Sequence, residues 1–384
     1  MKEKKKIIIY GGTFDPPHKG HFALIKEAVK TLNPSVVYVV PGFRSPFKET
    51  PCAPFKDRAE MLRAGLKAAG LGRGTCVKIH PYEFKRGRLT YTWQTAEFFR
   101  KAHPGAELYL LMGSDCLETF HRWKKYRRIL NSARLVVGVR DGFALKNPRR
   151  LSYIKLKGRF PLIASAELKV RLFSGQGQPG LGKNVFEYIT RRGLYLTGQR
   201  RRAAKLMTAQ RFVHTIAVTR LALALAVKYG ADTKRTALAG LLHDIARDRT
   251  SRYLAAYAVR NRLTAPALKE TLKEAPILLH AYDGADIAEK RFGVKDKEVL
   301  SAIRNHTLGS PSPGLIDKIL YVADMAAEDR DFPEAVVVRK LAFRELGAAY
   351  AAANYVKLVY AFKTGRWIHP ESVKVWNKLS EKNN

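Results

Sequence analysis

The segment that most constrains the fold lies near the amino terminus, where an apolar run, a loop and an amphipathic run follow one another. Residues 7–10 read Ile-Ile-Ile-Tyr, a short apolar run that predicts a buried parallel strand. Residues 22–29 carry apolar side chains at helical spacing. The loop between them reads Gly-Gly-Thr-Phe-Asp-Pro-Pro-His-Lys-Gly-His. A strand-to-helix turn of this kind predicts the carboxyl edge of an open α/β sheet, where such sheets bind ligands.

The residue types in this loop favour a phosphate ligand. Gly11 and Gly12 allow the backbone to approach a ligand closely. The following helix start offers N–H groups and a positive dipole end to an anion. Asp15 is a candidate N-cap, with a proline in the first helical turn. His18 and His21 are three residues apart, so we expect them to point the same way and to steady charge on a phosphate.

Further runs along the first half repeat the alternation of strand and helix. Strands are predicted at residues 35–41, 76–79, 107–112 and 135–140, and helical segments at residues 57–62, 95–100 and around Phe120 and Trp123. Strands that alternate with helices in this way predict a parallel α/β sheet of the Rossmann-like kind.

The loop resembles the (H/T)xGH signature of nucleotidyltransferases, in the form GGxFxPxHxGH that is typical of nicotinate-mononucleotide adenylyltransferases. This resemblance implies adenylyl transfer from ATP to nicotinate mononucleotide, with Mg²⁺, giving deamido-NAD and pyrophosphate. It implies a catalytic set of His18, His21, Lys48 and Lys169. It also implies nucleotide contacts from Gly11, Gly12, Thr13, Phe14, Gly113, Asp115 and Ser165. The nicotinate pocket would be lined by Thr90, Tyr91, Thr92 and Trp123.

The same family resemblance is incomplete at two places. The second phosphate motif of the family reads ISSTxIR, whereas residues 163–169 read Ile-Ala-Ser-Ala-Glu-Leu-Lys. Lysine keeps the charge of arginine but loses its bidentate fork. Gln94 replaces the aspartate that follows the YT pair in the family. Two alternatives therefore stay open: a different acceptor nucleotide, or a degenerate nucleotide-sensing module that regulates the second half.

The strand pattern stops near residue 196. We predict a first domain over 1–196, a basic linker over 197–207 and an all-α second domain over 208–384. The second half contains apolar helical runs, among them 213–229 and 236–246, and a set of six metal-ligand residue types: His214, His243, Asp244, His280, His306 and Asp324. Imidazole with carboxylate suits Fe, Mn, Zn or Co with positions left for water.

The order H…HD…H…H…D resembles that of the HD-domain phosphohydrolases, and the wording around Arg211, His243 and His306 is similar to the YqeK-like branch. This resemblance implies two bound transition-metal ions, with iron as the expected element, and symmetrical hydrolysis of diadenosine tetraphosphate to two ADP. The acidic residue that follows the last aspartate in the family is shifted here, with Ala327 at that point and Glu328 next.

The composition of the chain bears on its ligands and on its cellular compartment. The net charge of +37, from 70 basic and 33 acidic residues, favours polyanionic ligands. The basic residues are spread along the chain, so we expect incidental nucleic-acid contact, and a dedicated RNA-associated protein stays open as a third alternative. Three widely spaced cysteines suit a reducing compartment. No signal peptide is recognised and no stretch comes near the roughly 20 apolar residues of a membrane span, so the expected location is the cytoplasm.

Overall fold

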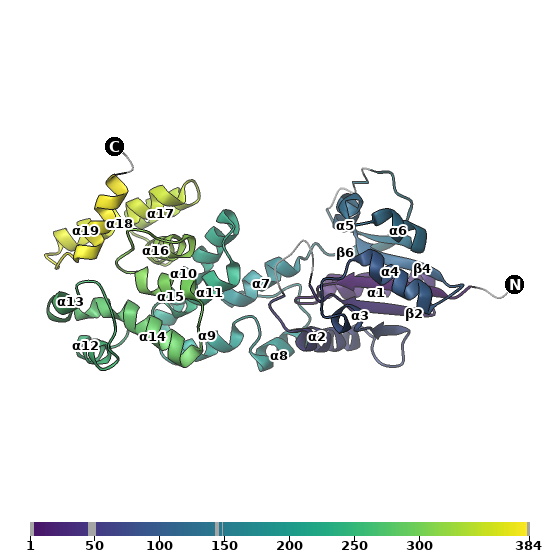
Figure 1. Cartoon of the computed structure of the whole chain (residues 1–384), viewed down its shortest axis with the longest axis horizontal. Coiled ribbons are helices and arrows are strands. Elements are labelled where there is room, and N and C mark those ends of the chain that lie inside the picture. The colour runs from purple at the N-terminus through teal and green to yellow at the C-terminus, as the bar shows by residue number, and fades with distance from the viewer. Residues whose placement is uncertain (1–3, 45–50, 143–145, 148, 382–384) are drawn as a thin grey trace. The chain divides into compact units, whose positions relative to one another are not determined.

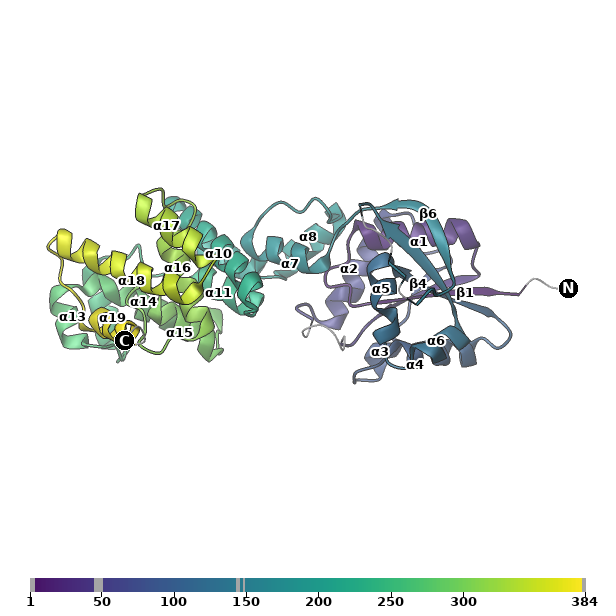
Figure 2. The same cartoon turned by 90° about the horizontal axis from the view of Figure 1, so that it is seen from above.

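The computed structural model describes residues 4–44, 51–142, 146–147 and 149–381, and Figure 1 and Figure 2 label its elements. The chain forms two compact units. One contains residues 1–172 and 177–195, and the other contains residues 173–176 and 196–384. That the chain divides into separable domains at the bounds 1–196, 197–207 and 208–384 stays a prediction.

The first unit is built on a six-stranded parallel sheet with the order β3-β2-β1-β4-β5-β6. The strands are β1 (Lys6–Gly12), β2 (Val36–Pro41), β3 (Val77–Ile79), β4 (Glu107–Gly113), β5 (Arg134–Arg140) and β6 (Tyr153–Phe160). The order reverses between β1 and β4, and a crevice at such a reversal is where open α/β sheets bind ligands. The predicted α/β fold is confirmed. The prediction missed β6, because its sequence alternates apolar and basic residues instead of forming an apolar run.

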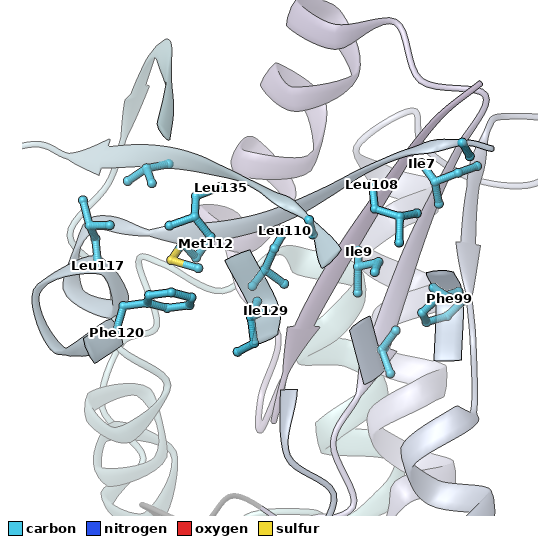
Figure 3. Close-up of a cluster of buried hydrophobic side chains, with 14 of the residues drawn as sticks. Ile7, Ile9, Phe99, Leu108, Leu110, Met112, Leu117, Phe120, Ile129 and Leu135 are labelled. Atoms are coloured by element: carbon cyan, nitrogen blue, oxygen red, sulfur yellow. The ribbon is translucent and has the colours of Figure 1, made fainter. Parts of the chain in front are cut away.

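The first unit also contains helices. They are α1 (Lys19–Leu32), α2 (Phe55–Ala68), α3 (Tyr82–Lys85), α4 (Thr92–Ala102), α5 (Ser114–Thr119), α6 (Tyr126–Ser132), α7 (Ser165–Ser174) and α8 (Lys183–Arg192), with a 3-10 turn η1 (Phe120–Arg122). One core cluster joins alternate residues of the central strands to α4–α6 (Figure 3), with Ile7 and Ile9 beside Leu108 and Leu110. Ile8 is equally buried on the opposite face, which explains the continuous apolar run.

The second unit is all-α, as predicted. Its helices are α9 (Thr197–Ala204), α10 (Ala209–Tyr229), α11 (Thr233–Leu242), α12 (Ser251–Arg260), α13 (Leu268–Glu274), α14 (His280–Phe292), α15 (Lys297–Asn305), α16 (Leu315–Ala326), α17 (Pro333–Ala342), α18 (Leu346–Lys363) and α19 (Pro370–Ser380), with a 3-10 turn η2 (Pro276–Leu279). Most of the expected linker is therefore the helix α9. Its Thr197 and Ala203 are buried, and arginine and alanine are good helix formers.

Helix α10 packs against α11 and α16 in the second unit. It is long and apolar enough to cross a membrane by length and composition, which the sequence analysis did not foresee. Half of its apolar window is buried inside the unit, as in the core helix of a folded domain. It packs closely on α11, since a Cβ at Gly240 would lie 2.9 Å from Thr219 Oγ1. This close approach brings the ligand candidates of the two helices together.

Candidate functional site

In the first unit, the loop after β1 is anchored by a buried aspartate. Asp15 is 3% exposed and accepts hydrogen bonds from Cys52 N (2.8 Å), Ala53 N (3.1 Å) and Tyr195 Oη (2.6 Å). The predicted N-cap role of Asp15 is wrong: α1 begins at Lys19, so His18 holds the N-cap position and both prolines precede the helix. Asp15 instead ties the loop to two distant segments of the same unit.

The two histidines of the loop lie together, as predicted. Their rings stack at a centroid distance of 3.6 Å, and His18 N–H donates to His21 Nδ1 at 3.1 Å. The ring of Phe14 packs edge-on against His21 at 5.0 Å. Gly20 leaves room for this ring, because a Cβ at that position would lie 3.1 Å from the His18 ring. His18 is only 3% exposed, so its imidazole is buried within the loop.

The glycines of the loop lie where the sequence placed them. Gly11 and Gly12 end β1 and pair with β2 residues. A Cβ at Gly12 would lie 2.9 Å from the Phe14 ring, so glycine lets that ring cover the backbone. Phe14 itself is buried and has a left-handed φ of 51°. The carbonyl oxygen of Thr13 accepts a hydrogen bond from Arg58.

Arg58 holds the loop from below, and the sequence analysis did not identify it. Its guanidinium donates to the carbonyl oxygens of Thr13 (2.6 Å), Gly42 (2.8 Å) and Ala53 (3.2 Å). The side chain is 2% exposed, and burial lowers its pKa. The one available signal was an arginine among the apolar residues of α2. Three backbone segments around the candidate phosphate site therefore share one buried donor.

The altered second motif also reaches the loop. Ser165, the first residue of α7, donates from Oγ to Pro16 O at 2.9 Å, and Lys169 Nζ lies 3.9 Å from Asp15 Oδ2. These contacts bring Ser165 and Lys169 beside the loop of residues 11–21 that carries His18 and His21 (the histidine loop), as the sequence predicted. Lys48 lies outside the described residues.

The third candidate segment follows β4. Gly113 ends that strand and Asp115 lies in the first turn of α5. Arg140, at the end of the neighbouring strand β5, places Nη2 at 3.5 Å from Asp115 Oδ2. The sequence analysis did not identify Arg140. The Gly-Ser-Asp turn thus lies at the carboxyl edge of the sheet, with a positive charge beside its carboxylate.

The expected nicotinate residues come from two segments that meet. Thr90 is buried, Tyr91 holds the N-cap position of α4 and Thr92 opens that helix. The Lys124 ammonium lies 4.5 Å from the centre of the Tyr91 ring, which brings the neighbour of Trp123 to this turn.

Two further details at this turn differ from the sequence analysis. Trp123 follows η1 in extended conformation and is not part of a helix. Its ring packs 5.2 Å from Phe120, against the core cluster. Gln94, the substituted position, accepts from Tyr91 N at 3.0 Å and so serves as part of the helix cap.

In the second unit, the six predicted ligands gather in one buried place. His214 lies in α10, His243 and Asp244 follow α11, His280 opens α14, His306 follows α15, and Asp324 lies near the end of α16. Two groups of close ligand atoms are His214 with His243 and Asp244, and Asp244 with His280 and His306. Asp324 Oδ1 lies 3.3 Å from His214 Nε2 and 4.0 Å from His243 Nε2. Asp244 is common to both groups.

The four imidazoles are oriented for metal binding. His243, His280 and His306 each place Nδ1 2.6–2.8 Å from the carbonyl oxygen three residues earlier in the chain. His214 Nδ1 lies 2.7 Å from Asp329 Oδ2 instead. A carbonyl or carboxylate on one ring nitrogen leaves the other, Nε2, as the ligand atom. His243 Nε2 is buried and has no hydrogen-bond partner within the described part of the chain, as expected of an atom that binds a metal ion.

The protonation states of three of these residues suit the same purpose. Burial lowers the pKa of His243 to about 4 and that of His280 to about 3, so both imidazoles are neutral near pH 7. Burial alone would raise the pKa of Asp244, but the surrounding imidazoles outweigh it and hold that pKa far below its ordinary value. Neutral imidazole and ionised carboxylate are the metal-binding forms. The donor set therefore fits a pair of divalent transition-metal ions.

Positive side chains surround these carboxylates. Arg211 Nη1 lies 2.9 Å from Asp244 Oδ2, Arg330 Nη2 lies 3.7 Å from Asp324 Oδ1, and Lys357 Nζ lies 3.4 Å from Asp324 Oδ2. The sequence analysis did not identify Lys357, which is contributed by α18 and also donates to His306 O at 2.9 Å. It also missed Asp329, the partner of His214.

A cavity of about 670 Å³ opens onto the cluster. Its polar part is formed by Asp244, His280, His306, Thr307, Asp324, Glu334, Arg211, Arg247, Arg330 and Lys357. Its remaining wall is largely apolar, from η2, α16 and α18. Metal ligands, cations and an apolar wall in one cavity can receive a substrate that carries both phosphates and an apolar ring system.

Both halves of the chain are similar to known protein families. The family model of cytidylyltransferase-like proteins matches residues 9–170, and that of the HD domain matches residues 211–329. A probable nicotinate-nucleotide adenylyltransferase/Ap4A hydrolase of Mycoplasma genitalium is 30% identical over 329 residues, which cover 85% of this chain and 89% of the relative.

Single-function relatives match each half separately. A probable nicotinate-nucleotide adenylyltransferase of Nitratiruptor is 38% identical over 43% of this chain and 88% of its own. The symmetrical bis(5'-nucleosyl)-tetraphosphatase of Bacillus subtilis is 34% identical over 45% of this chain and 91% of its own. Because one relative spans both units in the same order, the chain belongs to the family of nicotinate-nucleotide adenylyltransferase/Ap4A hydrolases.

Proposed function

We propose that this protein catalyses two reactions, adenylyl transfer from ATP to nicotinate mononucleotide in the first unit and symmetrical hydrolysis of diadenosine tetraphosphate in the second. The observation that supports the pair most strongly is that the histidine loop and the six-ligand cluster are each assembled in three dimensions within one chain. We place the protein in the cytoplasm, where ATP and pyridine mononucleotides are available.

In the first reaction, a phosphate oxygen of the mononucleotide attacks the α-phosphorus of ATP, and pyrophosphate leaves. The protein needs to position two anions and to stabilise charge in the transition state. His18 and His21 stack at the loop, and Lys169 approaches from α7. Ser165 and Arg58 hold this loop in place. A Mg²⁺ ion carried by ATP would supply further neutralising charge.

In the second reaction, water attacks an inner phosphorus of the tetraphosphate, and ADP leaves. The six ligands would hold two divalent cations, iron in our proposal, which supply an activated water and a phosphate clamp when bound. Asp244 fits both positions because it belongs to both ligand groups. Arg211, Arg330 and Lys357 bring positive charge to the same cavity and so favour a polyphosphate over neutral ligands.

The test is product identification with the purified full chain. With ATP and nicotinate mononucleotide we expect deamido-NAD and pyrophosphate, and with diadenosine tetraphosphate we expect ADP alone. Label from ¹⁸O-water should enter one ADP of each pair. AMP with ATP as products would contradict symmetrical cleavage.

The variant Asp244→Asn separates the two reactions. It keeps the side-chain shape but removes a shared negative ligand, so metal content and hydrolysis should fall while adenylyl transfer is unchanged. Hydrolysis that persists in this variant at low metal content would refute the role of the cluster. A chain that hydrolyses the tetraphosphate but makes no deamido-NAD with any mononucleotide would favour the sensing-module alternative for the first unit.

A further inference from the structure

The cavity over the metal cluster has two chemically different parts, and one helix contributes to both. Lys357 and Tyr360 of α18 both line it. They are three residues apart and therefore share a helix face, with an axial rise of about 4.5 Å between them. Lys357 lies at the cluster end, because its Nζ is 3.4 Å from Asp324 Oδ2. Tyr360 thus lies one helical turn from the phosphate-binding end.

Much of the remaining cavity wall is apolar. Ile277, Leu278, Met325, Phe332 and Val356 line the cavity together with Tyr360, and Thr307 and Glu334 are its further polar residues. Hydrolysis of a bare polyphosphate would not require such a wall. A purine ring attached to the polyphosphate would cover this apolar wall, since ligand cavities combine a few polar groups with hydrophobic and aromatic lining.

The Tyr360 ring has the features of a stacking platform. It is 52% exposed, although it lines the cavity, and the Arg366 guanidinium lies 5.0 Å from its ring centre. A guanidinium on an aromatic ring fixes that ring through a cation–π contact. A purine can stack on the exposed part of the ring while its phosphates extend toward Lys357 and the cluster.

We propose that Tyr360 is the residue on which one adenine ring of the substrate stacks, and that it makes the second unit selective for nucleoside polyphosphates over bare polyphosphates. This assignment deepens the hydrolase proposed above and rests on it. A contact to the base is present in the ground state and the transition state alike, so it should act on KM and not on kcat.

A matched control is available on the same helix. Tyr355 is 54% exposed, close to the value for Tyr360, but it contacts Trp376 at a ring distance of 5.8 Å and does not line the cavity. Both tyrosines can be replaced by alanine in the full chain. Comparison of the two variants separates stacking on the substrate from the general loss of an aromatic side chain on α18.

The experiment measures diadenosine tetraphosphate hydrolysis with two competitive inhibitors, ADP and inorganic pyrophosphate. Inhibition of hydrolysis reports on the second unit alone, even though nucleotides also bind the first. For Tyr360→Ala we expect KM and the inhibition constant of ADP to rise about tenfold or more, which is the scale of base–aromatic stacking. The constant for pyrophosphate, kcat and the metal content per chain should stay at wild-type values. Tyr360→Phe and Tyr355→Ala should resemble the wild type.

Three results would overturn the assignment. They are an unchanged inhibition constant for ADP in Tyr360→Ala, an equal rise for pyrophosphate, or the same effect in Tyr355→Ala. In each case wild-type hydrolysis would still support the hydrolase. Absence of hydrolysis in the metal-loaded wild type would overturn the hydrolase and this assignment together.

Discussion

Replacement of one buried carboxyl group should stabilise the protein. Asp283 lies in α14 and is 0% exposed, and neither of its carboxyl oxygens has a hydrogen-bond partner within the residues that the structure describes. Burial raises its pKa from 3.8 to about 8, and the nearby Asp286 adds to the effect. The folded state therefore keeps a proton that the unfolded chain loses near pH 4.

The magnitude follows from this difference in proton binding. A raised pKa in the folded state gives stability that is complete below the unfolded pKa and is lost as the pH rises toward the folded one. Each unit of pKa corresponds to about 1.4 kcal/mol, so the loss reaches about 4 kcal/mol at pH 7 and about 6 kcal/mol above pH 8. Asp283→Asn cannot ionise, but its unpartnered amide costs about 1–2 kcal/mol. We expect a net gain of about 2–3 kcal/mol at pH 7 and about 4–5 kcal/mol at pH 8.5.

The assay is thermal unfolding of the metal-loaded full chain by calorimetry at pH 5.5 and pH 8.5. For a unit of this size, the gain at pH 8.5 corresponds to about 8–20 °C in the Tm of the helical transition. The difference between variant and wild type should shrink at the lower pH. The control is Asp317→Asn, because Asp317 is also buried but accepts hydrogen bonds from Ser301, Asn305 and Gly314. That variant should be destabilised. An Asp283→Asn protein that melts below the wild type at pH 8.5 would refute the reasoning.

Three further predictions concern the two sites. His21→Ala should reduce adenylyl transfer on the order of 100-fold without unfolding the first unit, whereas His18→Ala should also lower its Tm, because His18 is buried; equal transfer rates in both variants and the wild type would contradict a catalytic role. Trp123→Ala should raise KM for nicotinate mononucleotide more than KM for ATP, and equal changes would mark Trp123 as a core residue only. Asp329→Ala should weaken metal binding by about 10- to 100-fold in a chelator titration, because Asp329 orients a ligand histidine, and an unchanged titration would refute that role.

Most of the fold could be predicted because burial on both faces of a sheet produces continuous apolar runs. Val36–Pro41 and Glu107–Gly113 are of this kind. Strand β6 was missed, although its alternation of apolar residues with Lys155, Lys157 and Arg159 is the period-two pattern of a half-buried strand. Its edge position, by contrast, is a property of the assembled sheet that a single segment does not reveal.

The clustering of the six candidate ligands was predictable from their types and order, whereas the residues that contact them were not. Asp329 reaches His214 across 115 positions of sequence, and Lys357 reaches Asp324 across 33. Each looks like an ordinary surface charge until the helices are packed. The role of Asp15 was mistaken for the same reason: a local N-cap is the default for an aspartate before a helix, and its actual donors come from distant segments.

The contact between Asp15 and Tyr195 also sets the order in which the first active site can form during synthesis. The two residues are 180 positions apart, yet the Tyr195 hydroxyl is one of the groups that fix the loop at Asp15. At about 5–20 residues per second, the ribosome needs roughly 10–40 s to add the intervening chain. Throughout that interval the nascent chain carries the loop of His18 and His21 without the anchor from Tyr195. Nucleotide binding to the growing chain should therefore begin only after Tyr195 has left the ribosomal tunnel, while much of the helical unit is still to be made.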